Sequence, residues 1–271
     1  MAGVQALVKE GIGQMFINVL RLVVGMLPSG WVKRYLLCLS GWEIDPTAVF
    51  GPTLLLRVER MVLGPNCRIG FLNVMRDLKS VELEEGAIIG QWNWMSAALP
   101  LIGQSSPASA GRFKMLRQSS MSSRHYVDAS GGVTIGAFAT VAGVRSTFIT
   151  HGVDINSSMQ STARVEIGDY SILGSNSKLT PGSTVPSHSF VAMGSVVTRG
   201  LDEPYKLYAG TPARAVRNIP RQASYFARRV GPVASPADAA HGQPDASVTE
   251  SRIPSHPDPQ DRDLVGPIAT E

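Results

Sequence analysis

The sequence predicts an all-β solenoid, specifically a parallel β-helix, and two repeating patterns lead to this prediction. Aliphatic residues occupy every sixth position in the second half of the 271-residue chain: Ile167, Leu173, Leu179, Val185, Val191 and Val197. Serines recur four positions after the aliphatic residues: Ser171, Ser177, Ser183, Ser189 and Ser195. A period of six fits neither a helix, with a period of about 3.6, nor a plain strand, with a period of about 2. Hexapeptide repeats are instead typical of stacked β-helix coils.

The first element is a predicted N-terminal helical cap over residues 1–41. Apolar residues at spacings of three and four predict a helix over residues 1–27, and Ser29 is positioned to cap a second helix, Trp31 to Leu39. We expect both helices to pack on the main domain. In the alternative, they lie on a membrane surface with three basic residues facing acidic headgroups: Arg21, Lys33 and Arg34.

The N-terminal region does not have the pattern of a membrane span or a signal peptide. Its apolar run from Leu22 to Leu27 is far shorter than the ~20 residues of a spanning helix. Two isolated cysteines, Cys38 and Cys67, indicate a reducing compartment. We therefore expect a cytoplasmic protein, in the alternative one peripheral to the inner face of the membrane through residues 1–40.

The main domain is predicted over residues 42–219, because the repeat also occurs earlier, with interruptions. Its earlier aliphatic and aromatic positions are Ile44, Phe50, Leu63, Ile69, Met75, Leu83, Ile89, Ile135 and Val141. Residues 91–121 are predicted to be a long insertion. Its Trp92 and Trp94 could stack on a sugar ring or a lipid tail, but we expect them to pack the insertion onto the coil edge.

The C-terminal extension, residues 220–271, is predicted to be largely disordered from about residue 231. Seven of the 18 prolines fall in the last 41 residues, and no apolar period is present there. The segment from Leu201 to Arg229 is expected to return along the outside of the solenoid. The net charge of +4 is mild and scattered, which does not indicate a nucleic-acid partner.

Four motifs in the second half of the chain carry a family resemblance. They are Ile167-Gly168-Asp169-Tyr170-Ser171-Ile172-Leu173-Gly174, Leu179-Thr180-Pro181-Gly182, Gly194-Ser195-Val196-Val197-Thr198-Arg199 and Ala209-Gly210-Thr211-Pro212-Ala213-Arg214-Ala215-Val216-Arg217. In this order they resemble the hexapeptide-repeat acyltransferases, most closely the sugar and exopolysaccharide O-acetyltransferases, over roughly residues 120–219. The resemblance implies a left-handed β-helix, a homotrimer, a saccharide acceptor and acetyl-CoA as co-substrate, with no permanently bound cofactor.

One histidine stands outside the repeat. The count from Val141 to Ile167 is 26, which is not a multiple of six, so a loop containing His151 is expected to leave the solenoid. The resemblance places the catalytic histidine of the family here. An imidazole, with an ordinary pKa of ~6.5, can take a proton from a hydroxyl and return it to a thiolate. We therefore expect His151 to be the general base of a direct acyl transfer.

A second polar cluster precedes His151 and contains His125 and Asp128. His125 could bind sugar, assist as an acid or base, or orient a partner, and Asp128 could bond an imidazole and fix its tautomer. A structural polar turn is an equally good interpretation of this cluster.

The resemblance also assigns a set of coenzyme A contacts. Ser175 and Met193 would line the pantetheine arm, with Thr198 and Arg199 near it, whereas Arg214 and Arg217 would face the nucleotide phosphates. The chain departs from the family at Ile172, where a tryptophan is often found, so stacking by that residue is lost.

Two other functions remain open. A non-catalytic scaffold would bind no coenzyme A. A zinc enzyme similar to the γ-class carbonic anhydrases needs about three converging histidines. The spacing of His125, His151 and His188 does not suit that pattern, so we expect no metal.

Overall fold

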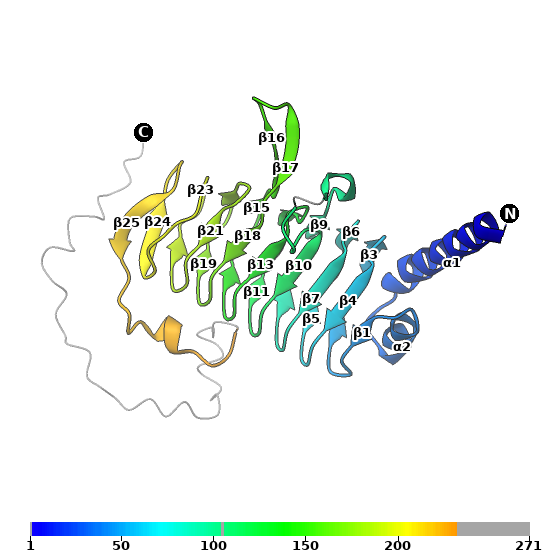
Figure 1. The fold of residues 1–271 in the computed structure, drawn as a ribbon. Coiled ribbons are helices and arrows are strands. Elements are labelled where there is room, and N and C mark those ends of the chain that lie inside the picture. The colour runs from blue at the N-terminus through cyan, green and yellow to red at the C-terminus, as the bar shows by residue number, and fades with distance from the viewer. Residues whose placement is uncertain (1, 104–105, 232–271) are drawn as a thin grey trace, which may run out of the picture. The chain divides into compact units, whose positions relative to one another are not determined.

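The computed structural model describes residues 2–103 and 106–231, with side chains from residue 13 onward, and three parallel sheets dominate it (Figure 1). Sheet A contains β1 (Glu43–Ile44), β4 (Arg60–Leu63), β7 (Ser80–Leu83), β10 (Arg112–Met115), β13 (Val133–Ile135), β18 (Val165–Ile167) and β21 (Thr184–Val185). Sheet B contains β2 (Val49–Phe50), β5 (Arg68–Ile69), β8 (Ile88–Ile89), β11 (Ser120–Met121), β14 (Thr140–Val141), β19 (Ile172–Leu173), β22 (Phe190–Val191), β24 (Lys206–Ala209) and the antiparallel β25 (Arg214–Asn218). Sheet C contains β3 (Thr53–Leu56), β6 (Asn73–Arg76), β9 (Trp94–Ser96), β12 (Tyr126–Asp128), β15 (Thr147–Phe148), β20 (Lys178–Leu179) and β23 (Val196–Val197). Coil after coil adds one strand to each sheet, which is the arrangement of a left-handed parallel β-helix and confirms the predicted fold class.

The repeat positions form the core. The six aliphatic residues from Ile167 to Val197 are all buried, and so are the earlier positions such as Leu63 and Leu83. Ile167 pairs with Val185, which is 18 positions later, whereas Leu63 pairs with Leu83, which is 20 positions later. The earlier coils are longer because their sheet C strands have four residues rather than two. This extra length explains why a count in sixes fails there.

The predicted insertion at residues 91–121 is shorter in the structure. Strands β9, β10 and β11 lie inside that range and continue the three sheets, so only the segment 97–111 leaves the coil, with a short 3-10 helix η1 (Leu99–Leu101). Trp92 and Trp94 are half-exposed on the coil rather than part of an excursion. The prediction erred because a 20-residue coil does not show a clean period of six.

A second excursion is a hairpin of β16 (His151–Asp154) and β17 (Met159–Thr162), which projects from the stack (Figure 1). Both excursions connect a sheet C strand to a sheet A strand, so both leave the same edge, which we call the C–A corner. The Thr162 hydroxyl donates to Ser106 Oγ at 2.9 Å and joins the two excursions.

Helices α1 (Ala2–Gly25) and α2 (Trp31–Leu39) pack against the first coil, as expected. The placement of Arg21 and Lys33 toward headgroups is wrong. Both side chains are buried, and Arg21 donates to the Val58 and Ser40 carbonyls at 2.9 and 2.6 Å. Lys33 Nζ donates to three carbonyls, those of Gly25, Leu27 and Gly51. Burial lowers the pKa of Lys33 to about 7.

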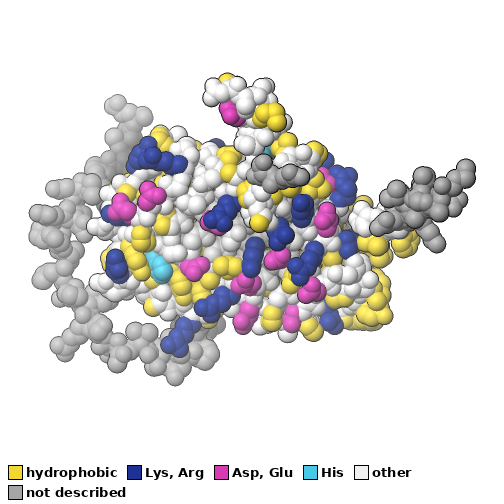
Figure 2. Space-filling model, in the orientation of Figure 1, with side chains coloured by type: hydrophobic (Ala, Val, Ile, Leu, Met, Phe, Trp, Pro, Cys, Tyr) yellow, Lys and Arg dark blue, Asp and Glu magenta, His cyan; other side chains and the backbone are white. Residues whose placement is uncertain are grey.

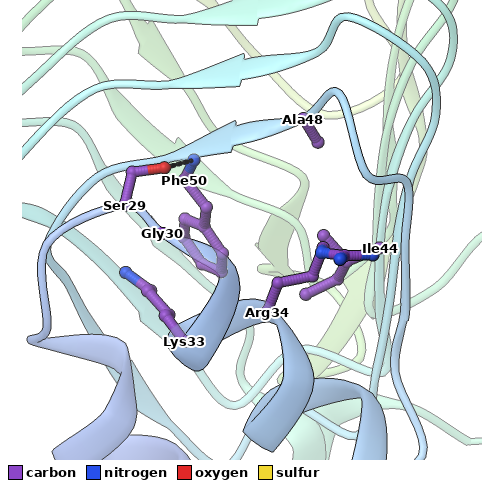
Figure 3. A pocket seen from close by; sticks show the side chains of 7 residues that line it. All are labelled: Ser29, Gly30, Lys33, Arg34, Ile44, Ala48 and Phe50. Carbon is purple, nitrogen blue, oxygen red and sulfur yellow. Dashed lines mark hydrogen bonds between the residues drawn. The ribbon is translucent and has the colours of Figure 1, made fainter.

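Ser29 does not cap α2. Its hydroxyl instead accepts the Phe50 N–H at 3.0 Å, while Lys33 Nζ lies 4.1 Å from the centre of the Phe50 ring (Figure 3). The space between α2 and the first strands is about 10 Å³, room for about one water molecule. This junction is a packed seam rather than a ligand site. No helix among the residues the structure describes is long and apolar enough to cross a bilayer.

The segment after β25 returns along the outside of the solenoid, as predicted, through a 3-10 helix η2 (Ser224–Ala227). It covers an aromatic column at the A–B corner, where successive rings are 4.7, 5.3 and 4.9 Å apart: Phe138, Tyr170, His188 and Tyr205. Arg228 lies over Tyr225 and donates to the Phe138 carbonyl, and the Gly231 N–H donates to Gln118. The tail predicted to be disordered lies, from residue 232, outside the described residues.

Candidate functional site

Asp128 and His151 form a hydrogen-bonded pair at the C–A corner. Asp128 is the last residue of β12, and strand alternation turns its side chain outward, after Tyr126 out and Val127 in. His151 begins the hairpin one coil further on, and its Nδ1 lies 2.8 Å from Asp128 Oδ2. The sequence prediction named both residues, and the register of sheet C brings them together.

Four further hydrogen bonds hold the Asp128 carboxylate in place. Ser130 donates through its N–H and its hydroxyl to Oδ1, and Thr150 donates through both groups at 2.8 Å to Oδ2. Burial alone raises the pKa of Asp128, but the bonds from Ser130, Thr150 and His151 outweigh it, and the pKa is lowered overall. The group is therefore a carboxylate at neutral pH.

An ionised carboxylate can only accept, so His151 Nδ1 carries the proton in this pair. The neutral imidazole then has its lone pair on Nε2. His151 is about one-third exposed and lines a cavity of about 560 Å³ at the C–A corner. The cavity is lined by Arg57, Arg76, Asp77, Ser96, Ala97, Ala98, Leu99, Pro100, Tyr126, Asp128 and His151. The arrangement provides an oriented base at the wall of a ligand-sized groove.

His125 lies elsewhere, in a buried polar ladder at the B–C corner, where sheet B strands lead into sheet C. The ladder has one residue per coil, directly before or at the start of each sheet C strand: Thr53, Asn73, Asn93, His125, Ser146, Ser177 and Ser195. Its links are regular, because a backbone N–H of one coil donates to the side chain of the previous one. Asn93 N–H bonds Asn73 Oδ1, His125 N–H bonds Asn93 Oδ1, and Ser146 N–H bonds His125 Nδ1.

Both ring nitrogens of His125 are thus engaged, since Nε2 also lies 3.1 Å from Ser122 Oγ. The side chain is 2% exposed, and burial lowers its pKa to about 4. A neutral ring with both nitrogens bonded inside the coil is not placed to exchange protons with a substrate. The structure favours the structural interpretation of His125 over the acid–base one.

The predicted coenzyme A contacts do not gather around His151 within one chain. Ser175 and Met193 lie at the B–C corner, and Met193 is 72% exposed. Thr198 and Arg199 follow β23 at the C–A corner, the same edge as His151 but further along the stack. Arg214 and Arg217 are exposed on β25, the last strand of sheet B.

The three histidines considered for a metal stand at three different corners. His125 is at the B–C corner and His151 at the C–A corner, whereas His188 is stacked between Tyr170 and Tyr205 at the A–B corner. Within the described part of the chain, no three His, Cys, Asp or Glu side chains are grouped to hold a metal ion.

Sequence reasoning missed several residues of the site. Ser130 and Thr150, which hold Asp128, look like ordinary small turn residues in the sequence. Arg57, Arg76 and Asp77 come from coils nearly a hundred residues before His151. A count in steps of 20 would have found part of this set, because it aligns Arg76 with Ser96 on neighbouring strands.

Comparison with solved structures agrees with the coil architecture. A polysialic acid O-acetyltransferase, OatWY, matches with a TM-score of 0.50 and 16% identity over 68% of this chain and 90% of that one. The chain has the fold of a hexapeptide-repeat acyltransferase. An N-acyltransferase of Bacillus cereus, AntD, crystallised as a mutant with dTDP-4-amino-4,6-dideoxyglucose and coenzyme A, gives a TM-score of 0.46 and 16% identity over 60% of this chain and 86% of that one.

A hexapeptide-repeat acetyltransferase of Vibrio cholerae gives a TM-score of 0.38 and 17% identity over 76% of this chain and 90% of that one. No family model and no curated protein sequence matches the chain.

Proposed function

We propose that the chain is an acyl-CoA-dependent O-acyltransferase, an O-acetyltransferase in its simplest form, that acts on a saccharide hydroxyl in exopolysaccharide or surface-glycan modification. The observation that carries this proposal is the Asp128–His151 pair, 2.8 Å apart, at the wall of a groove. The fold supports it, because a glycan O-acetyltransferase shares the same coil architecture.

In the proposed mechanism, His151 is the general base of a direct transfer. Asp128 holds Nδ1–H, and Nε2 takes the proton of the acceptor hydroxyl as its oxygen attacks the thioester carbonyl of acyl-CoA. The new carbon–oxygen bond forms and the carbon–sulfur bond breaks. Nε2–H then returns the proton to the departing thiolate, so the enzyme ends in its starting state.

The coenzyme A residues call for a second subunit under this proposal. Ser175 and Met193 occupy a different corner from His151, so one chain cannot present both sets to one thioester. A homotrimer, in which the B–C corner of one copy faces the C–A corner of the next, would bring the sets together. Sedimentation equilibrium tests this assembly, and a monomer at catalytic concentrations would exclude it.

Thiol release from acetyl-CoA tests the function directly. The acceptor panel contains saccharides and lipid-linked sugars, and the variants are His151→Ala and, as a matched control, Asp154→Asn on the same hairpin strand. We expect turnover by the wild type, normal turnover by Asp154→Asn, and a loss of about 10²- to 10⁴-fold in His151→Ala with coenzyme A binding retained. A wild type that binds no coenzyme A would replace the enzyme with the scaffold alternative.

We also propose that the helical cap rests on a lipid surface through apolar side chains. Its exposed residues include Met15, Phe16, Val19, Val23, Trp31, Val32, Tyr35 and Leu39, and Figure 2 shows hydrophobic side chains gathered over this end of the molecule. From residue 13 to residue 39 the three charged side chains are turned at least partly inward, the reverse of a water-facing helix pair. Exposed Trp31 and Tyr35 suit the headgroup region.

Co-sedimentation with phosphatidylcholine vesicles tests this contact. Binding that is lost in the double variant Phe16→Ser with Trp31→Ser would support it. A wild type that stays in the supernatant, or that uses this face to associate with a second copy without vesicles, would overturn it.

A further inference from the structure

The end of the groove away from His151 is basic. Arg76, Ser96 and Asp128 are the outward residues of three neighbouring strands in register, so they form one row along sheet C. At ~4.8 Å between strands, Arg76 lies about 10 Å before Asp128 along this row. Arg57 and Asp77 are the next residues after β3 and β6, at the same corner position one coil apart.

Asp77 holds the two arginines together. Its carboxylate is almost buried, and it accepts Arg57 Nε on Oδ1 and Arg76 Nε, at 2.8 Å, on Oδ2. Each guanidinium therefore uses its inner nitrogen for Asp77. The outer nitrogens of both make no hydrogen bond within the described part of the chain, and both side chains are at least half-exposed on the cavity wall.

The charge of this cluster is suited to an anion. Two guanidinium groups and one carboxylate leave a net charge of +1. Outer guanidinium nitrogens donate well-oriented pairs of hydrogen bonds that match carboxylate or phosphate oxygens. A pair of arginines needed only for stability would not have to face a cavity shared with an oriented histidine.

We propose that Arg57 and Arg76 bind an anionic group, a carboxylate or a phosphate, of the acceptor, so that the substrate is an acidic glycan. This inference rests on the proposed acyltransferase function, because it assigns the acceptor to the groove that His151 lines. The anionic group sits two to three coils from the acylated hydroxyl. Tyr126, which is exposed and lies between the two ends of the groove, provides a ring face for an intervening sugar.

The experiment compares a carboxylated acceptor, an oligogalacturonate, with its neutral methyl ester and with a phosphorylated mannose oligosaccharide. Binding is measured by calorimetric titration, and acetyl transfer is measured separately by thiol release. The variants are Arg57→Gln and Arg76→Gln, with Arg60→Gln as the control. Arg60 has similar exposure and also pairs with carboxylates, but it lies on sheet A outside the cavity.

We expect each groove variant to weaken binding of the charged probe about tenfold, and to leave binding of the ester and the behaviour of Arg60→Gln unchanged. The probe that responds, the carboxylate or the phosphate, names the anion. Equal effects on charged and neutral probes, or a wild type that prefers neither charged probe to the ester, would overturn the proposal. A wild type that binds the charged probe but transfers no acetyl group would retain the anion site and refute the enzymatic function instead.

Discussion

Replacing His125 with asparagine tests whether this histidine is a structural member of the buried ladder. Asparagine occupies the equivalent position in the two preceding coils, and in Asn93 its Oδ1 accepts the same backbone N–H that Nδ1 accepts in His125. The variant should therefore fold while losing a titratable group. Its consequence should appear in the dependence of stability on pH.

The sign and size of that dependence follow from the lowered pKa. The folded-state pKa of His125 is about 4, against an ordinary value of 6.5, so the unfolded chain binds a proton that the folded chain refuses between these values. Stability is then lost as the pH falls from about 6.5 to about 4. The difference of about 2.5 pH units, at ~1.4 kcal/mol each, gives about 3 kcal/mol as an upper bound.

The assay is urea unfolding followed by circular dichroism, at fixed protein concentration and a series of pH values. The free energy of unfolding of the wild type should fall by up to ~3 kcal/mol more than that of His125→Asn across this window. Acetyl transfer at neutral pH should persist in the variant. Parallel stability curves for the two proteins would refute the structural assignment of the pKa, and loss of transfer in a folded variant would restore His125 to the chemistry.

Three further predictions concern the base, a coil contact and the return segment. Asp128→Asn should lower turnover about 10²- to 10⁴-fold with unchanged coenzyme A affinity, because the imidazole loses its fixed tautomer; normal turnover in a folded variant would contradict this. Gly90→Ala should cost about 1–3 kcal/mol in urea unfolding, because its Cβ would lie 2.5 Å from the Ser122 carbonyl oxygen, whereas Gly103→Ala, with open space around it, should cost less than ~0.5 kcal/mol. Arg228→Ala should speed proteolytic cleavage of the segment after residue 219 roughly tenfold, through lost stacking on Tyr225, and an unchanged cleavage rate would show that the segment is held by other contacts.

The sequence predicted the coil architecture well because the buried positions repeat at a fixed interval where the coils have 18 residues. Ile167 and Val185 are both repeat positions and strand partners. The boundary errors fall where coils have 20 residues, since the extra pair in β6 or β9 shifts the count. A hexapeptide rule then takes β9 to β11 for an insertion.

The site was only partly predictable for a related reason. His151 is visible because it breaks the repeat, and Asp128 because its residue type suits an imidazole partner. The role of His125 depends on which side of the coil it faces, and that is set by the register with Asn93. The arginine pair depends on a contact with Asp77 across one coil, which no local pattern reports.

The return segment changes how the stack can come apart. A solenoid whose coils contact only their neighbours loses its ends one coil at a time. Here the chain leaves the last coil and bonds Gln118, Phe138, Thr140 and Tyr170 in turn, so it links coils that are otherwise not in contact. Opening the last coil alone would strain or break these distant bonds, so the second half of the solenoid should melt as one cooperative block.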